Sequence, residues 1–336
     1  MKINHQPKRI ILAVDLKAED PTLTKRVWAQ LKPLLKNENT LVEPVTILNR
    51  DDAAVGSLLK NRIGSLRAAT ERHLGARLKE MGLENLAPPR VLFADGSSTQ
   101  RAVMALLDYA KKIECNLIAV SSHSRHGFDR IFLESFAETL SLQSPVPLFV
   151  VRANQKVISG KLKKILFPTD FSVKSKEALN IVCKSFSETK PKITLFHSYS
   201  LPFQNYMEPF ISYPLPQSAI EEDYKNIARL GKDWAQELKK RGFACEVILD
   251  RKSSFVTAGI LAALKKSKAE LVALVSSTGK WRAKLLASTT RQVLRSSPRP
   301  VWVVHPENRK EGEKAVKLRQ NSQRGMPLVA TFASHR

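Results

Sequence analysis

Residues 163–172 read Lys-Lys-Ile-Leu-Phe-Pro-Thr-Asp-Phe-Ser, and this stretch decides the fold. A basic pair leads into a short apolar run, which stops at Pro-Thr-Asp before Ser172 opens an amphipathic segment. That order predicts a buried strand, a polar tip and the start of a helix. Residues 9–15, Arg-Ile-Ile-Leu-Ala-Val-Asp, carry the same pattern near the beginning of the chain. The chain therefore starts over in its middle, which indicates an internal duplication.

Further matched segments define the repeat. Asp15 corresponds to Asp170, about 155 residues later. At that offset, or within two residues of it, an apolar strand that ends in two serines recurs, and so does a closing strand introduced by prolines. These segments are residues 117–122 and 272–277, and residues 145–151 and 298–304. Because a two-copy repeat indicates a duplicated domain, we expect one domain at residues 1–155, a second at 156–306 and a basic, mobile tail at 307–336.

Within each copy, strands that are apolar throughout alternate with amphipathic segments of helical period. Such strands are typical of a parallel sheet covered by helices on both faces. Because crossovers between parallel strands are right-handed, the pattern predicts an α/β protein with two doubly wound, five-stranded parallel sheets. Local signals mark helix limits. Asp20 and either Ser97 or Ser98 are predicted N-caps, and Pro33 is expected to kink or end the first helix.

The composition is typical of a protein without a membrane span. The chain has 336 residues, enough for two domains, and no apolar run approaches the roughly 18 residues that cross a bilayer. Residues 1–8 are polar and lack the apolar centre of a signal peptide, so we expect a cytoplasmic protein. The cysteines, Cys115, Cys183 and Cys245, form no close pair in the sequence and are expected to be buried structural thiols.

The formal net charge of +24 is the unusual property of the composition. Such a charge favours polyanionic partners, which include nucleic acids, acidic proteins and anionic lipid surfaces. The basic residues are spread along both halves and form no single dense arm, as in a solvated surface that aids solubility. A basic scaffold for nucleic acid or an acidic partner and a solvated basic surface both stay open as interpretations.

In an open α/β sheet, ligands lie beyond the carboxyl ends of the strands, where the winding reverses. Asp15 with residues 121–125, and Asp170 with residues 276–280, are predicted to lie at those ends. An aspartate at a strand tip suits a polar contact to a ribose or to an adenine edge. It suits equally well the capping of the next helix or turn. The sequence therefore leaves two roles open for each aspartate.

Residues 165–172 resemble the opening of a universal stress protein domain. Residues 121–125 and 276–280 resemble that family's loop after the fourth strand, and the closing Pro-x-Pro strands are similar too. The resemblance covers residues 8–305 and implies a tandem protein whose domains have a flavodoxin-like or adenine nucleotide alpha hydrolase-like fold. Family members commonly pair through their last strands, which implies either self-association or an internal pseudo-dimer of the two copies.

ATP-binding members of that family carry Gly-x-x-Gly, then nine residues, then Gly followed by Ser or Thr. The glycines let backbone amides approach phosphates, and the final pair opens a helix whose N-terminus favours anions. In the first copy these positions hold Ser121, Ser124, Glu134 and Ser135. A carboxylate at Glu134 takes the place of the anion and stabilises the helix start by about 0.3–1 kcal/mol. We therefore expect the first copy not to bind ATP as the family does.

The second copy is closer to the family pattern. Ser276, Gly279 and Ser288 match, but an alanine replaces the third glycine and the spacing is two residues shorter. A basic cluster that includes Lys280 suits either a grip on phosphates by charge or a solvated loop. Ser198 stands where ATP-binding members place an apolar residue, which weakens the adenine pocket. The resemblance thus implies ATP as a cofactor of this copy alone, at Pro168, Thr169, Asp170, Ser276, Gly279, Lys280 and Ser288.

No arrangement of serine, cysteine or carboxylate residues typical of a catalytic site is evident, and the sequence has no GxxxxGK[ST] loop. His123 and His126 alone are too little to indicate a metal site. The resemblance implies a non-catalytic stress-response protein whose nucleotide site is lost in the first copy and weakened in the second. The alternatives are an ATP-binding regulatory switch in the second copy, with or without slow hydrolysis, and the basic scaffold.

Overall fold

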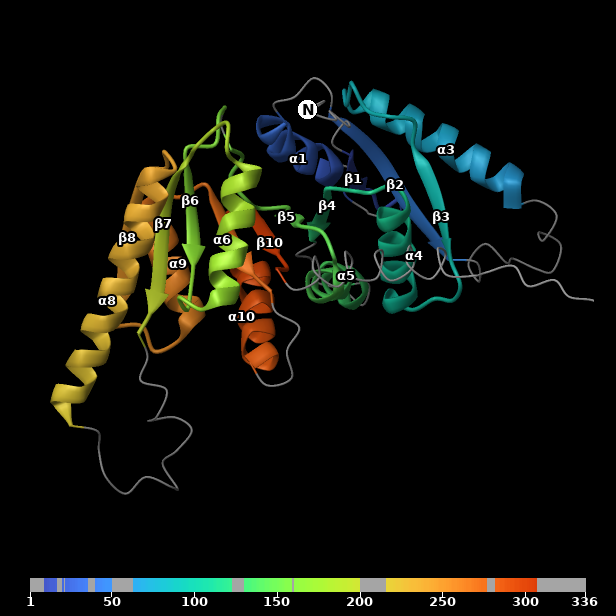
Figure 1. Cartoon of the computed structure of the whole chain (residues 1–336). Coiled ribbons are helices and arrows are strands. Elements are labelled where there is room, and N and C mark those ends of the chain that lie inside the picture. Colours follow the sequence, from blue (N-terminus) through green and yellow to red (C-terminus); the bar gives the residue numbers. More distant parts are fainter. Residues whose placement is uncertain are drawn as a thin grey trace, which may run out of the picture.

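The structure is a computed structural model, shown in Figure 1. It describes residues 9–16, 20, 22–35, 40–49, 63–122, 130–158, 160–199, 216–276 and 282–306, with the backbone alone for 130–135 and 282–288. Strands and helices alternate through both halves, as the sequence predicts. The predictions for residues 123–126, for residues 277–280 and for the tail at 307–336 lie outside the described residues.

The first half contains the strands β1 (Arg9–Ala13), β2 (Leu41–Asn49), β3 (Arg90–Ala94), β4 (Leu117–Ser122) and β5 (Leu148–Arg152). Its helices are α1 (Thr22–Leu31), the short 3-10 helix η1 (Lys32–Leu34), α3 (Ile63–Glu80), α4 (Thr99–Lys112) and α5 (Arg130–Gln143). The strands of the second half are β6 (Lys164–Pro168), β7 (Lys192–Ser198), β8 (Cys245–Asp250), β9 (Leu271–Val275) and β10 (Val301–Val304). Its helices are α6 (Val173–Ser185), α8 (Gln217–Lys240), α9 (Val256–Ser267) and α10 (Arg282–Ser296).

The two predicted parallel sheets are present, and they are joined edge to edge into one sheet. The strand order is β3-β2-β1-β4-β5-β10-β9-β6-β7-β8, with the two halves meeting at β5 and β10. This pair is antiparallel, with Phe149 opposite Trp302, whereas the other strand pairs are parallel. The last strand of each half is therefore an interior strand, and neither leaves an open edge for another chain to extend.

Two apolar cores cover the opposite faces of this sheet, and each core runs through both halves. One face is packed by α1, α3, α6 and α8, through buried residues such as Leu31, Leu74 and Leu179. The other face is packed by α4, α5, α9 and α10, through residues such as Leu106 and Val293. Because the strands are buried on both sides, they read as continuous apolar runs in the sequence.

Side-chain caps fix several helix starts where the sequence predicts them. The backbone N–H of Thr22 donates to Asp20 Oδ1 over 2.9 Å, and that of Arg101 donates to Ser98 Oγ over 3.3 Å. Ser172 Oγ accepts from the N–H of Ser175 over 3.2 Å and caps α6. Helix α1 ends at Leu31, and the following turn, with Pro33, is 3-10. A proline lacks the N–H that would continue the helix. The prediction that Pro33 kinks or ends the first helix is therefore confirmed.

Polar contacts tie the halves together beside the central strand pair. Gln155 Nε2 donates to the carbonyl oxygens of Ser297 and Arg299 over 3.0 and 2.7 Å. Arg295 Nε donates to Glu138 Oε1 over 2.5 Å, and the Glu138 side chain is only 12% exposed. The buried imidazole of His305 contacts the carbonyl oxygen of Ser141. We call the contact between the two halves around β5 and β10 the seam, and it combines apolar packing with charge-assisted hydrogen bonds.

The cysteines behave as structural thiols. Cys115 and Cys183 are buried, Cys245 is partly buried, and none of them forms a disulfide. Burial raises the pKa of each thiol to about 11. Because the thiolate is the reactive form, these side chains are inert at neutral pH.

Candidate functional site at the strand ends

The strand order places the predicted site residues of the second half at one edge of the sheet. β6 lies between β9 and β7, so the winding reverses at the ends of β6 and β9. Leu166 of β6 pairs with Val272 of β9, and both strands run in the same direction. Thr169 and Asp170, after β6, therefore lie beside Ser276, after β9. This crevice is where doubly wound sheets bind ligands.

Of the predicted residues, the structure brings together Pro168, Thr169, Asp170 and Ser276. Thr169 and Ser276 are buried, and the N–H of Ser276 donates to the carbonyl oxygen of Val304 over 2.9 Å. Gly279 and Lys280 lie outside the described residues. Ser288 belongs to α10, but its side chain is not described. The structure thus gives the positions of Pro168, Thr169, Asp170 and Ser276, and the nucleotide-binding role of all seven residues stays a prediction.

Asp170 serves the start of α6. Its Oδ1 accepts from the N–H of Ser172 over 3.0 Å and from Ser175 Oγ over 2.6 Å. Partial burial raises the pKa of this carboxyl, but the hydrogen bonds from Ser172 and Ser175 outweigh burial and bring the pKa below its ordinary value. Asp170 therefore remains ionised at neutral pH. Of the two roles that the sequence leaves open, the capping role is present in the structure.

The turn that follows β6 is fixed by strained backbone and by aromatic contacts. Phe171 has a φ of +56°, which is uncommon for a residue other than glycine. Its N–H donates to Thr169 Oγ1 over 2.9 Å, and its ring lies 5.4 Å from that of His197 and 5.2 Å from that of Trp234. His197 Nδ1 lies 2.8 Å from the carbonyl oxygen of Thr169. Sequence reasoning assigned His197 no role at this tip, because contacts between strands are not visible in a local pattern.

Two buried polar atoms lie at the neighbouring strand ends without a hydrogen-bond partner among the described residues. They are Ser198 Oγ at the end of β7 and Asp250 Oδ2 at the end of β8, and the two residues are paired in the sheet. Burial raises the pKa of Asp250, but hydrogen bonds from Ser253 and Lys252 outweigh burial and bring the pKa below its ordinary value. The carboxylate therefore stays charged at neutral pH. Buried polar groups are normally satisfied, so unpaired ones favour a bound water or ligand at this edge.

A second cluster at this edge surrounds Arg251. Its guanidinium lies 4.5 Å from the ring centre of Tyr224 and 5.9 Å from that of Tyr199, and it donates to Glu221 Oε1 over 2.8 Å. Tyr199 Oη donates to Asp223 Oδ2 over 3.0 Å. These contacts hold the first turns of α8 against the ends of β7 and β8.

The first half has the same layout of strands. β1 pairs with β4, so Asp15 lies beside Ser121 and Ser122 at the carboxyl ends. Glu134 belongs to α5, where its side chain is not described, and the loop before α5 lies outside the described residues. The expectation that Glu134 displaces a phosphate therefore stays a prediction.

Neither metal ligands nor membrane spans are found in the described part of the chain. No group of three or more histidine, cysteine, aspartate or glutamate side chains is placed to hold a metal ion there. Among the described helices, none is both long and apolar enough to cross a bilayer.

Comparison with known proteins gives a consistent result. The sequence model of the universal stress protein family matches residues 7–152 and again residues 161–305. A universal stress protein from Archaeoglobus fulgidus is 17% identical and superposes with a TM-score of 0.62, over 90% of this chain and 99% of that one. A putative universal stress protein from Pseudomonas aeruginosa is 14% identical with a TM-score of 0.57, over 92% and 98%. No protein of curated function is significantly similar in sequence.

A shorter universal stress protein, solved in complex with cAMP, also matches. It is 16% identical and covers 43% of this chain and 98% of its own length, with a TM-score of 0.31.

Proposed function

Because the chain belongs to the universal stress protein family, with one family domain in each half, we propose that it is a non-catalytic stress-response protein with unequal halves. In this proposal the first half has lost its nucleotide site and the second half keeps a weakened one. The family as a whole includes nucleotide-binding members, one of them bound to cAMP. The proposal concerns which half of this chain retains that property.

The position of Asp170 carries the proposal. The carboxylate lies at the switch point beside Thr169 and Ser276, as a nucleoside contact requires. At the same time Oδ1 already accepts hydrogen bonds from Ser172 and Ser175. A ligand must therefore use the other carboxylate oxygen or displace the serines. Displacing the serines costs their hydrogen bonds to Oδ1 and therefore weakens binding.

The sequence of the glycine positions supports the difference between halves. The first half has Ser121, Ser124 and Glu134 where ATP-binding members have three glycines, and the second half keeps Gly279. A β-carbon hinders the approach of backbone amides to a phosphate, and a glutamate adds repulsion between like charges. The second half thus retains more of a phosphate site than the first.

Equilibrium dialysis with ATP tests the proposal on three proteins: wild type, Asp170→Asn and Asp15→Asn. Asp15 is the matched control, because it occupies the position in the first half that Asp170 occupies in the second. We expect no more than one ATP per wild-type chain, with affinity weaker than about 100 μM. Asp170→Asn should abolish this binding and Asp15→Asn should leave it unchanged. Two bound nucleotides per chain, or binding lost in Asp15→Asn alone, would contradict the proposal.

A regulatory switch in the second half is a second candidate. The unpaired atoms Ser198 Oγ and Asp250 Oδ2 favour it, because a ligand at the strand ends would satisfy them. A switch requires that ATP change the conformation of the chain. Hydrogen exchange with and without saturating ATP distinguishes the candidates. Protection that extends beyond the ends of β6, β7 and β9 supports a switch, whereas local protection supports a weakened site.

A further inference from the structure

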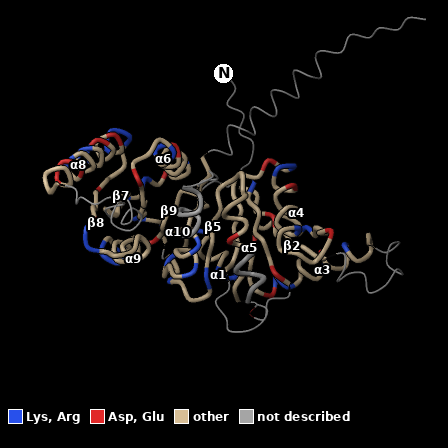
Figure 2. The backbone as a smooth tube through the Cα atoms, turned by 90° about the horizontal axis from the view of Figure 1, so that it is seen from below, with Lys and Arg blue, Asp and Glu red and all other residues tan. Residues whose placement is uncertain are grey.

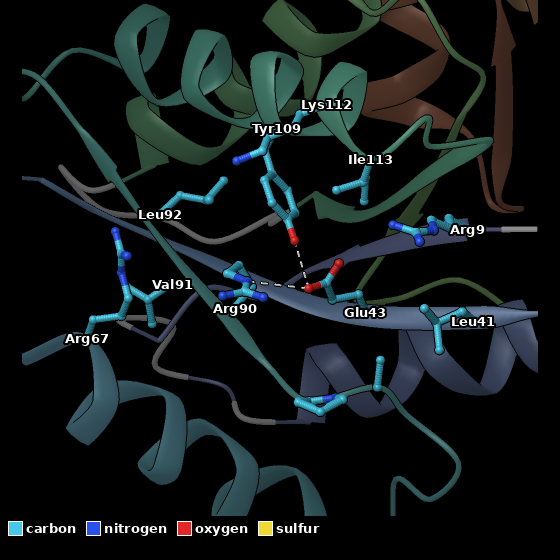
Figure 3. Close-up of a pocket in the computed structure, with 12 residues that line it drawn as sticks. Arg9, Leu41, Glu43, Arg67, Arg90, Val91, Leu92, Tyr109, Lys112 and Ile113 are labelled. Atoms are coloured by element: carbon cyan, nitrogen blue, oxygen red, sulfur yellow. Dashed lines mark hydrogen bonds and ion pairs between the residues drawn. The ribbon is translucent and has the colours of Figure 1, made fainter. Parts of the chain in front are cut away.

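A pocket opens at the amino ends of β1, β2 and β3, at the opposite end of the strands from Asp170 and Ser276. Its volume is about 530 Å³, within the usual range for small-molecule sites. The first residues of the three strands and the last turn of α4 form its walls, as Figure 3 shows. We call it the amino-end pocket, and its charged and polar lining consists of Arg9, Glu43, Arg67, Arg90, Tyr109 and Lys112.

The strand register explains why these side chains gather. Arg9 of β1 is paired with Leu41 of β2, and Glu43 follows two residues later on the same face. Val45 of β2 is paired with Arg90 of β3. Because side chains on a strand alternate between faces, Arg9, Glu43 and Arg90 all point toward α4. Tyr109 and Lys112, in the last turn of α4, close the pocket from above in Figure 3.

The lining is predominantly cationic. Four basic side chains and one carboxylate, that of Glu43, line the pocket. A second carboxylate, that of Glu71, accepts from the N–H of Val91 over 3.1 Å and lies near enough to Arg90 to raise its pKa. Glu43 Oε1 accepts from Tyr109 Oη over 2.8 Å and lies 3.6 Å from Arg90 Nε, with the Glu43 side chain only 13% exposed. No carboxylate of the described residues forms an ion pair with Arg9, Arg67 or Lys112. The pocket therefore presents an excess of positive charge to its contents.

Arg90 is held in position for an external anion. Its contact with Glu43 uses Nε, while its side chain remains 48% exposed. A hydrogen bond with Tyr109 and the charge of Glu43 raise the pKa of the guanidinium further above its ordinary value. Burial, together with the hydrogen bond to Glu43, raises the pKa of Tyr109, so the phenol stays protonated and keeps Glu43 in place. A fixed guanidinium loses less entropy on binding a carboxylate or phosphate than a mobile one.

The rest of the lining is apolar. Leu41, Pro88, Leu92 and Ile113 contribute hydrocarbon surface, and Leu41 is 41% exposed at the mouth of the pocket. An inorganic ion would leave this surface in contact with water. A ligand with an apolar body would cover it and gain roughly 25 cal/mol for each Å² removed from water.

The second half provides an internal comparison. Lys164 occupies the position of Arg9, at the start of β6. At this edge the carboxylate of Glu246 accepts hydrogen bonds from Lys192 and from Thr194 Oγ1, and Lys164 Nζ donates to the carbonyl oxygen of Ser267 over 3.4 Å. The basic groups of this edge are thus satisfied within the protein, in contrast to those of the first half.

We propose that the amino-end pocket binds a small organic anion that carries a phosphate or carboxylate group on an apolar body. The anionic group lies on the solvent side of Glu43, where it contacts Arg9 and the exposed end of the Arg90 guanidinium, and the apolar body lies against Leu41 and Ile113. This site is separate from the nucleotide site at the strand ends and does not depend on it.

Titration followed by backbone-amide NMR tests the proposal with four probes: phenyl phosphate, benzoate, inorganic phosphate and uncharged phenol. We expect phenyl phosphate or benzoate to shift the amides around Arg9, Arg90 and Lys112 saturably. The two probes distinguish the phosphate group from the carboxylate. Arg9→Gln and Arg90→Gln should each weaken binding about tenfold, because a charge-assisted hydrogen bond is lost. Lys164→Gln and Asp170→Asn are controls that should bind as wild type does.

Three outcomes would overturn the proposal. They are the absence of saturation by either organic anion below about 10 mM, phenol binding as tightly as phenyl phosphate, and equal weakening by Lys164→Gln. Loss of binding in Asp170→Asn instead would place the probe at the strand ends and would also overturn it. Should Arg90→Gln fail to fold, Arg9→Gln decides the question alone, because the Arg9 side chain is exposed and contacts no described carboxylate.

Discussion

Replacing His305 with glutamine should make the folded protein less sensitive to mild acid. His305 is 4% exposed and lies directly after β10, at the seam between the halves. Its Nε2 contacts the carbonyl oxygen of Ser141, which can only accept, so Nε2 carries the proton of the neutral ring. Nδ1 is buried and has no partner among the described residues. A second proton there would create a buried charge that no described group offsets.

The loss of folding stability in acid can be calculated from the pKa of His305. Burial lowers the pKa of His305 from 6.5 to about 4. Between these values the unfolded chain binds more protons than the folded one, so stability is fully present above pH 6.5 and is lost as the pH falls toward 4. Linkage then gives a loss of about 2 kcal/mol at about pH 5 and about 3 kcal/mol at about pH 4, relative to a side chain that does not titrate.

Urea unfolding at about pH 7 and about pH 5 measures this difference, because both values lie above the range where most carboxylates titrate. Glutamine is suitable because its amide can still donate to Ser141. The exposed His73 provides a matched control substitution, His73→Gln. An equal loss of stability in wild type and His305→Gln would refute the assignment of a neutral, buried imidazole.

Three further predictions concern packing, capping and the thiols. Gly259→Ala should destabilise the fold by about 1–3 kcal/mol in urea unfolding, because a Cβ there would lie 2.7 Å from Asp250 Oδ2 and 2.9 Å from the Phe196 ring. Gly64→Ala is the comparison: a Cβ at Gly64 would have no atom within 4 Å, and the change should stabilise the fold by about 0.5–1 kcal/mol. A similar effect from both alanines would contradict the close packing of α9 on β7. Ser172→Ala should cost about 1 kcal/mol through loss of the α6 cap, and a change below about 0.3 kcal/mol would argue against that cap. Cys115 and Cys183 should react with a disulfide reagent at about pH 8 only after unfolding, because burial raises the pKa of both thiols to about 11; rapid reaction of the folded protein would contradict their burial.

Helix limits and strand positions could be predicted because their signals are local. The apolar run at 165–167 becomes the buried centre of β6, and Ser172 and Ser98 cap the helices that they precede. A cap joins atoms only a few residues apart, so the sequence contains all the information that it needs. The duplication is equally readable, since it requires only a comparison of one segment with another.

The candidate site was predictable in part. Asp170 and Ser276 were expected at strand ends, and the strand order brings them together. The choice between capping and ligand contact for Asp170 needed the positions of Ser172 and Ser175. His197, Ser198 and Asp250 meet through the pairing of β7 with β8 and through the turn after β6. Their relation depends on register, which a single strand pattern does not specify.

By itself, the sequence determined that this chain is two copies of one α/β domain, because the periods of its apolar residues and the chemistry of its caps act over short distances. Only the tertiary structure decided that the copies share a single sheet through Phe149 and Trp302, that His305 is buried at their seam, and that Arg9, Glu43, Arg90 and Tyr109 line one pocket. These features join residues that are far apart along the chain. Their pairing is selected by the burial and hydrogen bonding of the whole fold, which no local pattern records.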